Sequence, residues 1–173
     1  GSSVLATEAL ARLNSRVRTQ LVTDPLTGLL NRSGFVAAAE RMRSVADRTG
    51  LPISIALIDL DKFKQVNDRQ GHAAGDELLV ELGREWRAEL RGSEVLARFG
   101  GDEFALALVG TERSGAEDAL RRLRVASPAD WSVGLVEWHR GESLDRAMAR
   151  ADEALYRAKR GSRELRAVSS FVA

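Results

Sequence analysis

The sequence predicts an α+β domain, in which β-strands and helices are mixed along one chain. Residues 95–97 and 104–109 are apolar runs separated by a tight glycine-rich segment, which is typical of a two-stranded hairpin. Residues 53–60 form a nearly continuous apolar run with several β-branched side chains, which indicates a buried central strand. Apolar residues also recur at helical spacing near both ends of the chain, so helices are expected there.

The first helix is expected at the start of the chain. Leu10, Leu13, Val17 and Leu21 form an apolar stripe at helical spacing. Two interpretations fit this stripe: a short coiled-coil linker, which we favour, or a helix that packs on its own domain.

The later elements follow from the same kind of pattern. Only one helix, at about residues 116–125, fits clearly before a strand at residues 131–136. The last helix is predicted from an apolar face whose members are expected in the core: Leu144, Ala147, Met148, Ala151, Ala154 and Leu155. The tryptophans are expected to be packing residues and one histidine to be a surface residue: Trp86, Trp131, Trp138 and His139.

The glycine-rich turn within residues 98–104 is the first candidate site. Gly100 and Gly101 can adopt positive φ, and without a Cβ they let a bulky group approach the backbone. Asp102 and Glu103 then stand at the tip of a rigid hairpin, where carboxylates suit Mg²⁺ and a nucleotide phosphate. Gly-Gly-Asp is also common in turns without any chemistry, so the hairpin alone leaves both interpretations open.

Two further carboxylates come at the end of the central strand. Asp59 and Asp61 are two residues apart, so they share one face of a strand. Open α/β sheets place ligands at this end of their strands. For Asp61 the expected role is to cap the next helix. Asp59 would be a carboxylate nearly inside a sheet, and a metal ion is the partner that best satisfies such a charge.

Asn67 and Asp76 form a third candidate site. Asn67 offers a carbonyl acceptor and amide donors, whereas an ionised Asp76 only accepts hydrogen bonds. Together they match the guanine edge, which presents N1–H and N2–H₂ donors beside the O6 acceptor. The same residue types also serve as ordinary turn and N-cap residues, so spacing alone does not decide between these roles.

Five motifs in one order identify a family. The chain resembles the GGDEF family, the diguanylate cyclases of bacterial signalling, from about Asp24 to Arg163. On this basis the chain divides into an N-terminal linker helix at 1–22, with an expression scar at 1–2, and a GGDEF domain at 23–173. The motifs are DPLTGLLNR at 24–32, IDLDKFK at 58–64, ND at 67–68, GHAAGD at 71–76 and RFGGDEF at 98–104.

The resemblance implies a fold and a reaction. Family members look like polymerase palms, with a central, mainly antiparallel sheet wrapped by helices. They join two GTP molecules into cyclic di-GMP and release two pyrophosphates. Each domain binds one GTP, so the resemblance implies a homodimer for catalysis, an inactive monomer, and two Mg²⁺ ions per active site, with Mn²⁺ as a substitute.

The resemblance also assigns roles to individual residues. Asp59, Asp102 and Glu103 correspond to metal ligands, assisted by the backbone carbonyl of Leu60. Asp102 and Glu103 are in addition the expected catalytic residues. The substrate-binding residues are Asn67 and Asp76 at the guanine edge, together with Phe63, Lys64, Gly100, Gly101, Lys159 and Arg163.

The chain departs from the family pattern in three places. Ser162 stands immediately before Arg163, where the family usually has glycine. The product-binding inhibitory motif Arg-x-x-Asp is replaced here by Arg91-x-x-Glu94, whose acid is one methylene longer. Alternatively, Arg91 ends a helix, Gly92 caps it and Glu94 opens an exposed strand. The segment between residues 104 and 131 is short, so a peripheral hairpin common in the family is expected to be missing.

Composition limits the remaining possibilities. The 173 residues suit one domain with a sizeable core. Lysine and arginine number 26 and aspartate and glutamate 25, so no basic excess points to nucleic acid. The absence of cysteine excludes disulfides and thiolate metal sites. No apolar run approaches the roughly 18 residues of a membrane span, and no signal peptide is visible.

Two classes of function therefore compete. The leading expectation is an active cytoplasmic diguanylate cyclase, attached to a sensor domain that is missing from this sequence and making no membrane contact itself. The alternative is a non-catalytic module that binds GTP or cyclic di-GMP, as family members do after losing their signature acids. Both signature acids and the guanine-reading pair are present here, which favours the enzyme.

Overall fold

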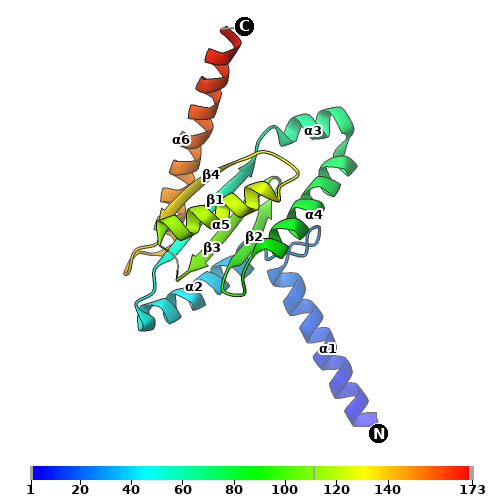
Figure 1. Cartoon of the computed structure of the whole chain (residues 1–173). Helices are drawn as coiled ribbons and strands as arrows, with labels where there is room; N and C mark the ends of the chain where they lie inside the picture. The colour runs from blue at the N-terminus through cyan, green and yellow to red at the C-terminus, as the bar shows by residue number, and fades with distance from the viewer. Residues whose placement is uncertain (1, 111, 172–173) are drawn as a thin grey trace.

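A computed structural model describes the backbone of residues 2–110 and 112–171 and the side chains of residues 3–19, 21–110 and 112–162. The predicted scar at 1–2 lies outside these described side chains. Four strands form one antiparallel sheet in the order β2–β3–β1–β4 (Figure 1). The strands are β1 (Ile53–Leu60), β2 (Val95–Gly100), β3 (Glu103–Val109) and β4 (Trp131–Glu137).

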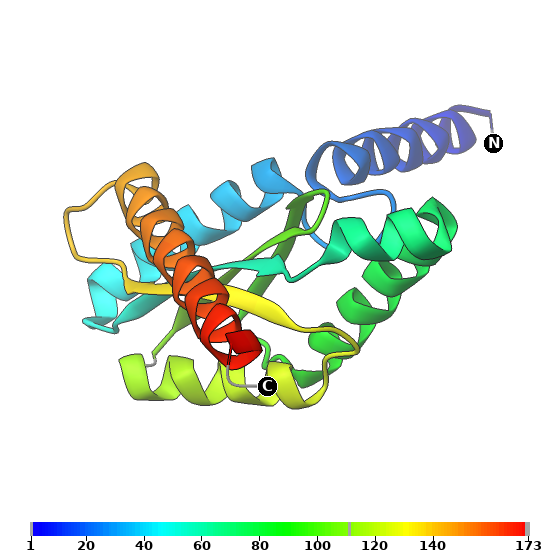
Figure 2. The ribbon, with the colours of Figure 1, turned by 90° about the horizontal axis from the view of Figure 1, so that it is seen from above.

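The described residues form six helices in addition to this antiparallel sheet, which confirms the predicted α+β class. α2 and α6 pack on one face, and α4 and α5 pack on the other (Figures 1 and 2). α5 is the only helix or strand among the described residues between β3 and β4. The helices are α1 (Ser2–Val22), α2 (Arg32–Thr49), α3 (Phe63–Gln70), α4 (His72–Glu89), α5 (Arg113–Val125) and α6 (Leu144–Phe171).

The alternation of strand side chains divides the core into two halves. In β1, Ile53 and Ile55 face α2 and α6, whereas Ala56 and Ile58 face α4 and α5. The predicted packing tryptophans are all buried, and the His139 side chain is exposed as expected. Of the predicted apolar face of α6, only Ala154 is not fully buried.

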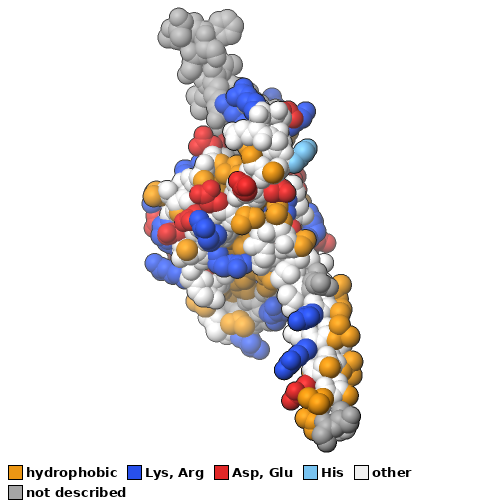
Figure 3. Space-filling model, turned by 90° about the vertical axis from the view of Figure 1, so that its right-hand side faces the viewer, with side chains coloured by type: hydrophobic (Ala, Val, Ile, Leu, Met, Phe, Trp, Pro, Cys, Tyr) orange, Lys and Arg blue, Asp and Glu red, His pale blue; other side chains and the backbone are white. Residues whose placement is uncertain are grey.

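α1 projects from the domain and leaves its apolar stripe uncovered (Figure 3). Every described side chain between residues 3 and 19 is exposed. The helix therefore does not pack its stripe on its own domain, which was one of the two interpretations of the sequence. The exposed large apolar side chains of α1 are Val4, Leu5, Leu10, Leu13, Val17, Leu21 and Val22.

The close contact between β4 and α6 depends on a glycine. A Cβ at Gly134 would lie 1.9 Å from the carbonyl oxygen of Ala151 and 2.4 Å from the amide nitrogen of Leu155. Both of these atoms belong to the α6 backbone, which a side-chain rotation cannot move. Gly134 thus allows α6 to lie directly against the sheet, and α6 carries Lys159 to the site described below.

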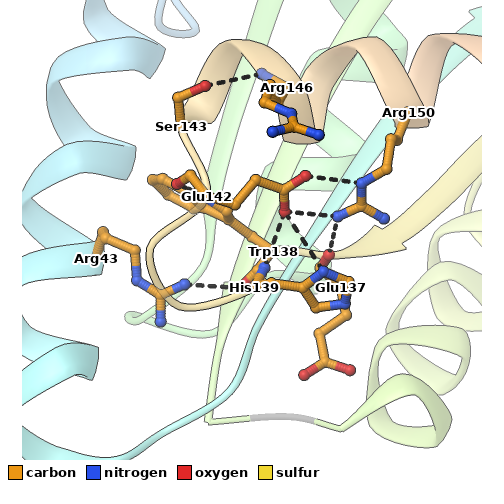
Figure 4. Close-up of polar contacts among 8 residues, drawn as sticks. All are labelled: Arg43, Glu137, Trp138, His139, Glu142, Ser143, Arg146 and Arg150. Carbon is orange, nitrogen blue, oxygen red and sulfur yellow. Dashed lines mark hydrogen bonds and ion pairs between the residues drawn. The ribbon is translucent and has the colours of Figure 1, made fainter.

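The loop between β4 and α6 is held by Glu142 (Figure 4). Its carboxylate accepts hydrogen bonds from the Arg150 guanidinium at 2.7 and 2.8 Å and from the backbone N–H of His139 at 3.1 Å. The Arg150 hydrogen bond, followed by the His139 N–H, lowers the pKa of Glu142 to about 2, against the opposing effect of burial.

We expect Glu142→Gln to be less stable than the wild type at neutral pH. In acid the difference in stability between the two should disappear. A carboxyl whose folded pKa is lowered stabilises the fold above its unfolded pKa, and that contribution disappears as the pH falls towards about 2. The expected loss at neutral pH is about 1–2 kcal/mol. Urea denaturation across this pH range measures it. Glu153→Gln, which removes an exposed ion pair with Arg157, is the control with little expected change. Equal losses of stability in Glu142→Gln at all pH values would show that the Glu142 charge is not the cause.

No helix among the described residues combines the length and the apolar character that a membrane crossing requires.

Candidate active site

The end of β1 and the turn between β2 and β3 form the centre of the candidate site. Asp59 lies opposite Glu103 in the β1–β3 register. The N–H of Leu60 donates to the carbonyl oxygen of Asp102 at 3.1 Å, so the turn is fixed to the strand end. The structure thus brings together Asp59 and Asp102, which are predicted metal ligands from two separate motifs.

The two carboxylates interact strongly. Burial, followed by the adjacent Asp59 carboxylate, raises the pKa of Asp102 to about 6. Lys159 reaches from α6 and pairs with Oδ2 of Asp59. The other oxygen, Oδ1, is buried and accepts no hydrogen bond from any described residue. The site therefore has more negative charge and acceptor capacity than its protein neighbours satisfy.

These features fit a divalent cation. A cation between Asp59 and Asp102 would satisfy Oδ1 of Asp59 and relieve the repulsion that raises the Asp102 pKa. Across the described side chains, no three acidic, histidine or cysteine groups cluster closely enough to bind a metal by themselves. Mg²⁺ suits a site with only two adjacent carboxylates, because it commonly binds one or two carboxylates together with substrate phosphates.

An ion pair between Arg98 and Asp24 lies next to the glycine-rich turn between β2 and β3, which we call the signature turn. Gly100 and Gly101 have φ values of +132° and +53°, as predicted for positions that favour glycine. The Arg98 guanidinium donates to the carbonyl of Gly101 at 2.8 and 3.0 Å and to Asp24 Oδ1 at 2.9 Å. Burial opposes the ionisation of Asp24, but hydrogen bonds from Thr27 and Arg98 outweigh it and lower the Asp24 pKa.

Sequence reasoning did not assign roles to Asp24 and Arg98. Both belong to motifs that were used to identify the family, at 24–32 and 98–104. Their place in two short motifs indicates that both residues matter. It does not indicate that they touch, because they are 74 positions apart.

The predicted helix cap at Asp61 is wrong. Its carboxylate accepts a hydrogen bond from the Ser132 hydroxyl at 2.8 Å, and its N–H donates to the carbonyl of Asp130. Asp61 therefore fixes the end of β1 to the start of β4. Lys62 occupies the N-cap of α3 in a left-handed conformation, with φ of 59°, and makes no side-chain cap hydrogen bond.

The guanine-reading pair lies on two consecutive helices. Asn67 is in the last turn of α3, and Asp76 is in the second turn of α4 with an exposed side chain. Asp76 does not cap α4, because Gly71 occupies that position. The side-chain Oδ1 of Asn67 is buried and accepts no hydrogen bond from a described residue.

The remaining predicted site residues lie around this centre. Phe63 begins α3 and packs against the core, whereas Lys64 is exposed beside it. Glu103 is exposed at the start of β3. Arg163 is part of α6, but its side chain is not among those that the structure describes.

Arg91 and Glu94 lie at the opposite end of β2 from the signature turn. The Glu94 side chain is only 6% exposed, accepts the N–H of Arg91 at 2.7 Å and pairs with Arg122 at 3.7 Å. The alternative interpretation is wrong in its details, because α4 ends at Glu89 with Leu90 as its C-cap and the Glu94 side chain is buried rather than exposed. Glu94 is engaged internally, and product binding at this motif stays a prediction.

Comparison with known proteins identifies the family. The profile described as "Diguanylate cyclase, GGDEF domain" matches residues 21–165. The chain belongs to the GGDEF family. Among curated GGDEF proteins, diguanylate cyclase DgcP of Pseudomonas aeruginosa is 37% identical over 159 residues, which cover 85% of this chain and 24% of that protein. Diguanylate cyclase DosC of Escherichia coli K12 is 35% identical over 159 residues, or 84% of this chain and 35% of DosC. The chain thus spans about a quarter to a third of these relatives.

Solved GGDEF structures share the fold. The coiled coil and GGDEF domain of DgcB from Caulobacter crescentus, in complex with c-di-GMP, superposes with a TM-score of 0.85 at 31% identity and covers 92% of each chain. Diguanylate cyclase SiaD from Pseudomonas aeruginosa, in complex with its activator SiaC, gives a TM-score of 0.77 at 35% identity, covering 92% of this chain and 66% of SiaD. These similarities confirm the predicted family and fold class.

Proposed function

We propose that two copies of this chain join two GTP molecules into cyclic di-GMP and release two pyrophosphates. The observation that carries the proposal is the pairing of Asp59 and Asp102 beside Lys159, with one buried carboxylate oxygen left without a hydrogen bond. Relatives named diguanylate cyclases match most of this chain, which supports the same chemistry here.

We assign metal binding to Asp59, Asp102 and Glu103, with the backbone carbonyl of Leu60. Asp59 and Asp102 already lie together, whereas the exposed Glu103 side chain would have to turn towards the ion. When bound, Mg²⁺ neutralises the negative charge that develops on the attacking and leaving oxygens. Two ions per site, with Mn²⁺ as a substitute, remain part of the proposal.

The remaining residues bind and orient GTP. Asn67 and Asp76 hold the guanine edge, while Lys64, Lys159 and Arg163 neutralise the triphosphate. Lys159 pairs with Asp59, which holds its ammonium group beside the proposed metal site. From there it can also contact the triphosphate of GTP. The two glycines of the turn let a phosphate group approach the backbone. Phe63, at the start of α3, supports the nucleotide.

The reaction requires two copies. In each of two steps, a 3′-oxygen of one GTP forms a bond to the α-phosphorus of the other. The bond from that phosphorus to pyrophosphate breaks, and the hydroxyl proton leaves. Because each chain holds one GTP, two sites must face each other. The exposed apolar stripe of α1 is the surface we propose to join the copies, and a sensor domain would act on catalysis through this helix.

Incubation with GTP and Mg²⁺, followed by mass spectrometry of the product, tests the proposed reaction. We expect cyclic di-GMP and pyrophosphate in a 1:2 ratio, and no cyclic product from ATP, because Asp76 would face an acceptor on adenine. A chain that binds GTP without turning it over would indicate a silent monomer that lacks the partner needed to dimerise it. A chain that binds no GTP would overturn the nucleotide site.

A further inference from the structure

We infer that Gly75 is a positioning residue for guanine recognition, because its missing side chain leaves the space that the Asn67 amide occupies. This inference rests on the proposed function, in which Asn67 and Asp76 hold the guanine edge. It concerns a residue to which the guanine-edge assignment gives no role, since Gly75 offers no side chain to a ligand.

The connection between α3 and α4 brings Gly75 against Asn67. Gly71 links the two helices with φ of +89°, a conformation that favours glycine. Its N–H donates to the carbonyl of Asn67 at 2.9 Å, and its own carbonyl accepts the N–H of Gly75 at 3.3 Å. The chain thus turns sharply, and the start of α4 folds back against the end of α3.

The contact at Gly75 leaves no room for a side chain. A Cβ at this position would lie 1.9 Å from Oδ1 of Asn67 and 3.2 Å from Cζ of Phe63. Oδ1 of Asn67 is buried and has no hydrogen-bond partner among the described residues, so packing against Gly75 holds this oxygen in place. Gly75 is buried and is the residue on which this packing depends.

The consequence of adding a Cβ is specific to Asn67. The atom that must move is the end of a side chain, which can rotate, and not backbone as at Gly134. α4 can therefore accept alanine while the Asn67 amide is displaced. Because Asp76 follows Gly75 directly, the displacement changes the spacing between the two residues that hold the guanine edge.

Gly75→Ala is therefore expected to weaken GTP binding about tenfold, the effect of losing one good base-edge contact, with a melting temperature close to that of the wild type. Gly83→Ala is the matched control, because it lies in the same helix, is buried, and its Cβ would meet side-chain atoms of Leu29 and Thr27 no closer than 3.4 Å. Titration of the wild type and both variants with GTP measures the effect.

The double variant separates positioning from a general structural effect. If Gly75 acts through Asn67, adding Gly75→Ala to Asn67→Ala should weaken GTP binding no further. Effects that multiply in the double variant, or wild-type affinity in Gly75→Ala, would overturn the inference.

A second measurement does not depend on GTP. The side-chain amide resonances of Asn67 in a ¹⁵N NMR spectrum should shift in Gly75→Ala and not in Gly83→Ala; unchanged resonances in Gly75→Ala would overturn the inference. A wild-type chain that binds no GTP would instead overturn the proposed function, so the two failures are distinguishable.

Discussion

Asp102→Asn is expected to reduce cyclic di-GMP synthesis by at least about 100-fold and to leave the chain no less stable than the wild type. The amide keeps the size of the carboxyl group but removes one of the three carboxylates assigned to metal binding. Asp59, which pairs with Lys159, would keep its charge but lose the carboxylate beside it. Initial rates of pyrophosphate release measure the first effect.

The stability effect has a defined pH dependence. Burial and the Asp59 carboxylate raise the pKa of Asp102 to about 6, from an ordinary value of 3.8. An acid whose pKa is raised by folding destabilises the folded state at pH values above that pKa, and this cost vanishes below the unfolded pKa. Asp102→Asn should therefore raise the free energy of unfolding at neutral pH, in the presence of EDTA, and change it little below about pH 4.

The control for Asp102 is an acid outside the site. Asp118 on α5 is exposed and paired with Arg121, so Asp118→Asn should retain full turnover. Wild-type turnover in Asp102→Asn would show that the site is assigned wrongly. A large loss of stability at neutral pH would show that the two carboxylates do not repel each other as described.

Gly134→Ala is expected to produce the largest loss of stability, about 3 kcal/mol. The added Cβ would overlap the α6 backbone at Ala151 and Leu155, so the helix must move away from β4. That movement would also separate Lys159 from Asp59, so turnover should fall with stability. Urea denaturation followed by circular dichroism measures the change.

Gly161→Ala is the matched control on α6. A Cβ there would meet nothing within 4 Å, and alanine favours a helix interior over glycine by about 1 kcal/mol. The variant should therefore be slightly stabilised. If Gly134→Ala were as stable as the wild type, the direct packing of α6 on β4 would be refuted.

Local sequence patterns predicted the elements well. The apolar run at 53–60, the hairpin around Gly100 and Gly101, and the apolar face of α6 are properties of neighbouring residues, and the structure confirms each. Conformations that depend on one residue type, such as positive φ at a glycine, can be predicted in the same way.

Contacts between distant segments could not be predicted from the residues alone. Lys159 and Asp59 are 100 positions apart, and no pattern within either segment indicates that they pair. Asp61 was expected to cap a helix because capping is a local signal, but Ser132, 71 positions away, is its actual partner. The Glu94 side chain likewise pairs with Arg122 in α5, and the family resemblance says nothing of that contact.

Measuring turnover and association in the same samples tests whether two copies of the chain must meet for catalysis. GTP turnover per chain and the dimer fraction from sedimentation should be followed over a roughly hundredfold range of protein concentration, because assembly depends on concentration. Turnover per chain is expected to rise in proportion to the dimer fraction. Full turnover in samples where the chain is monomeric would contradict this expectation.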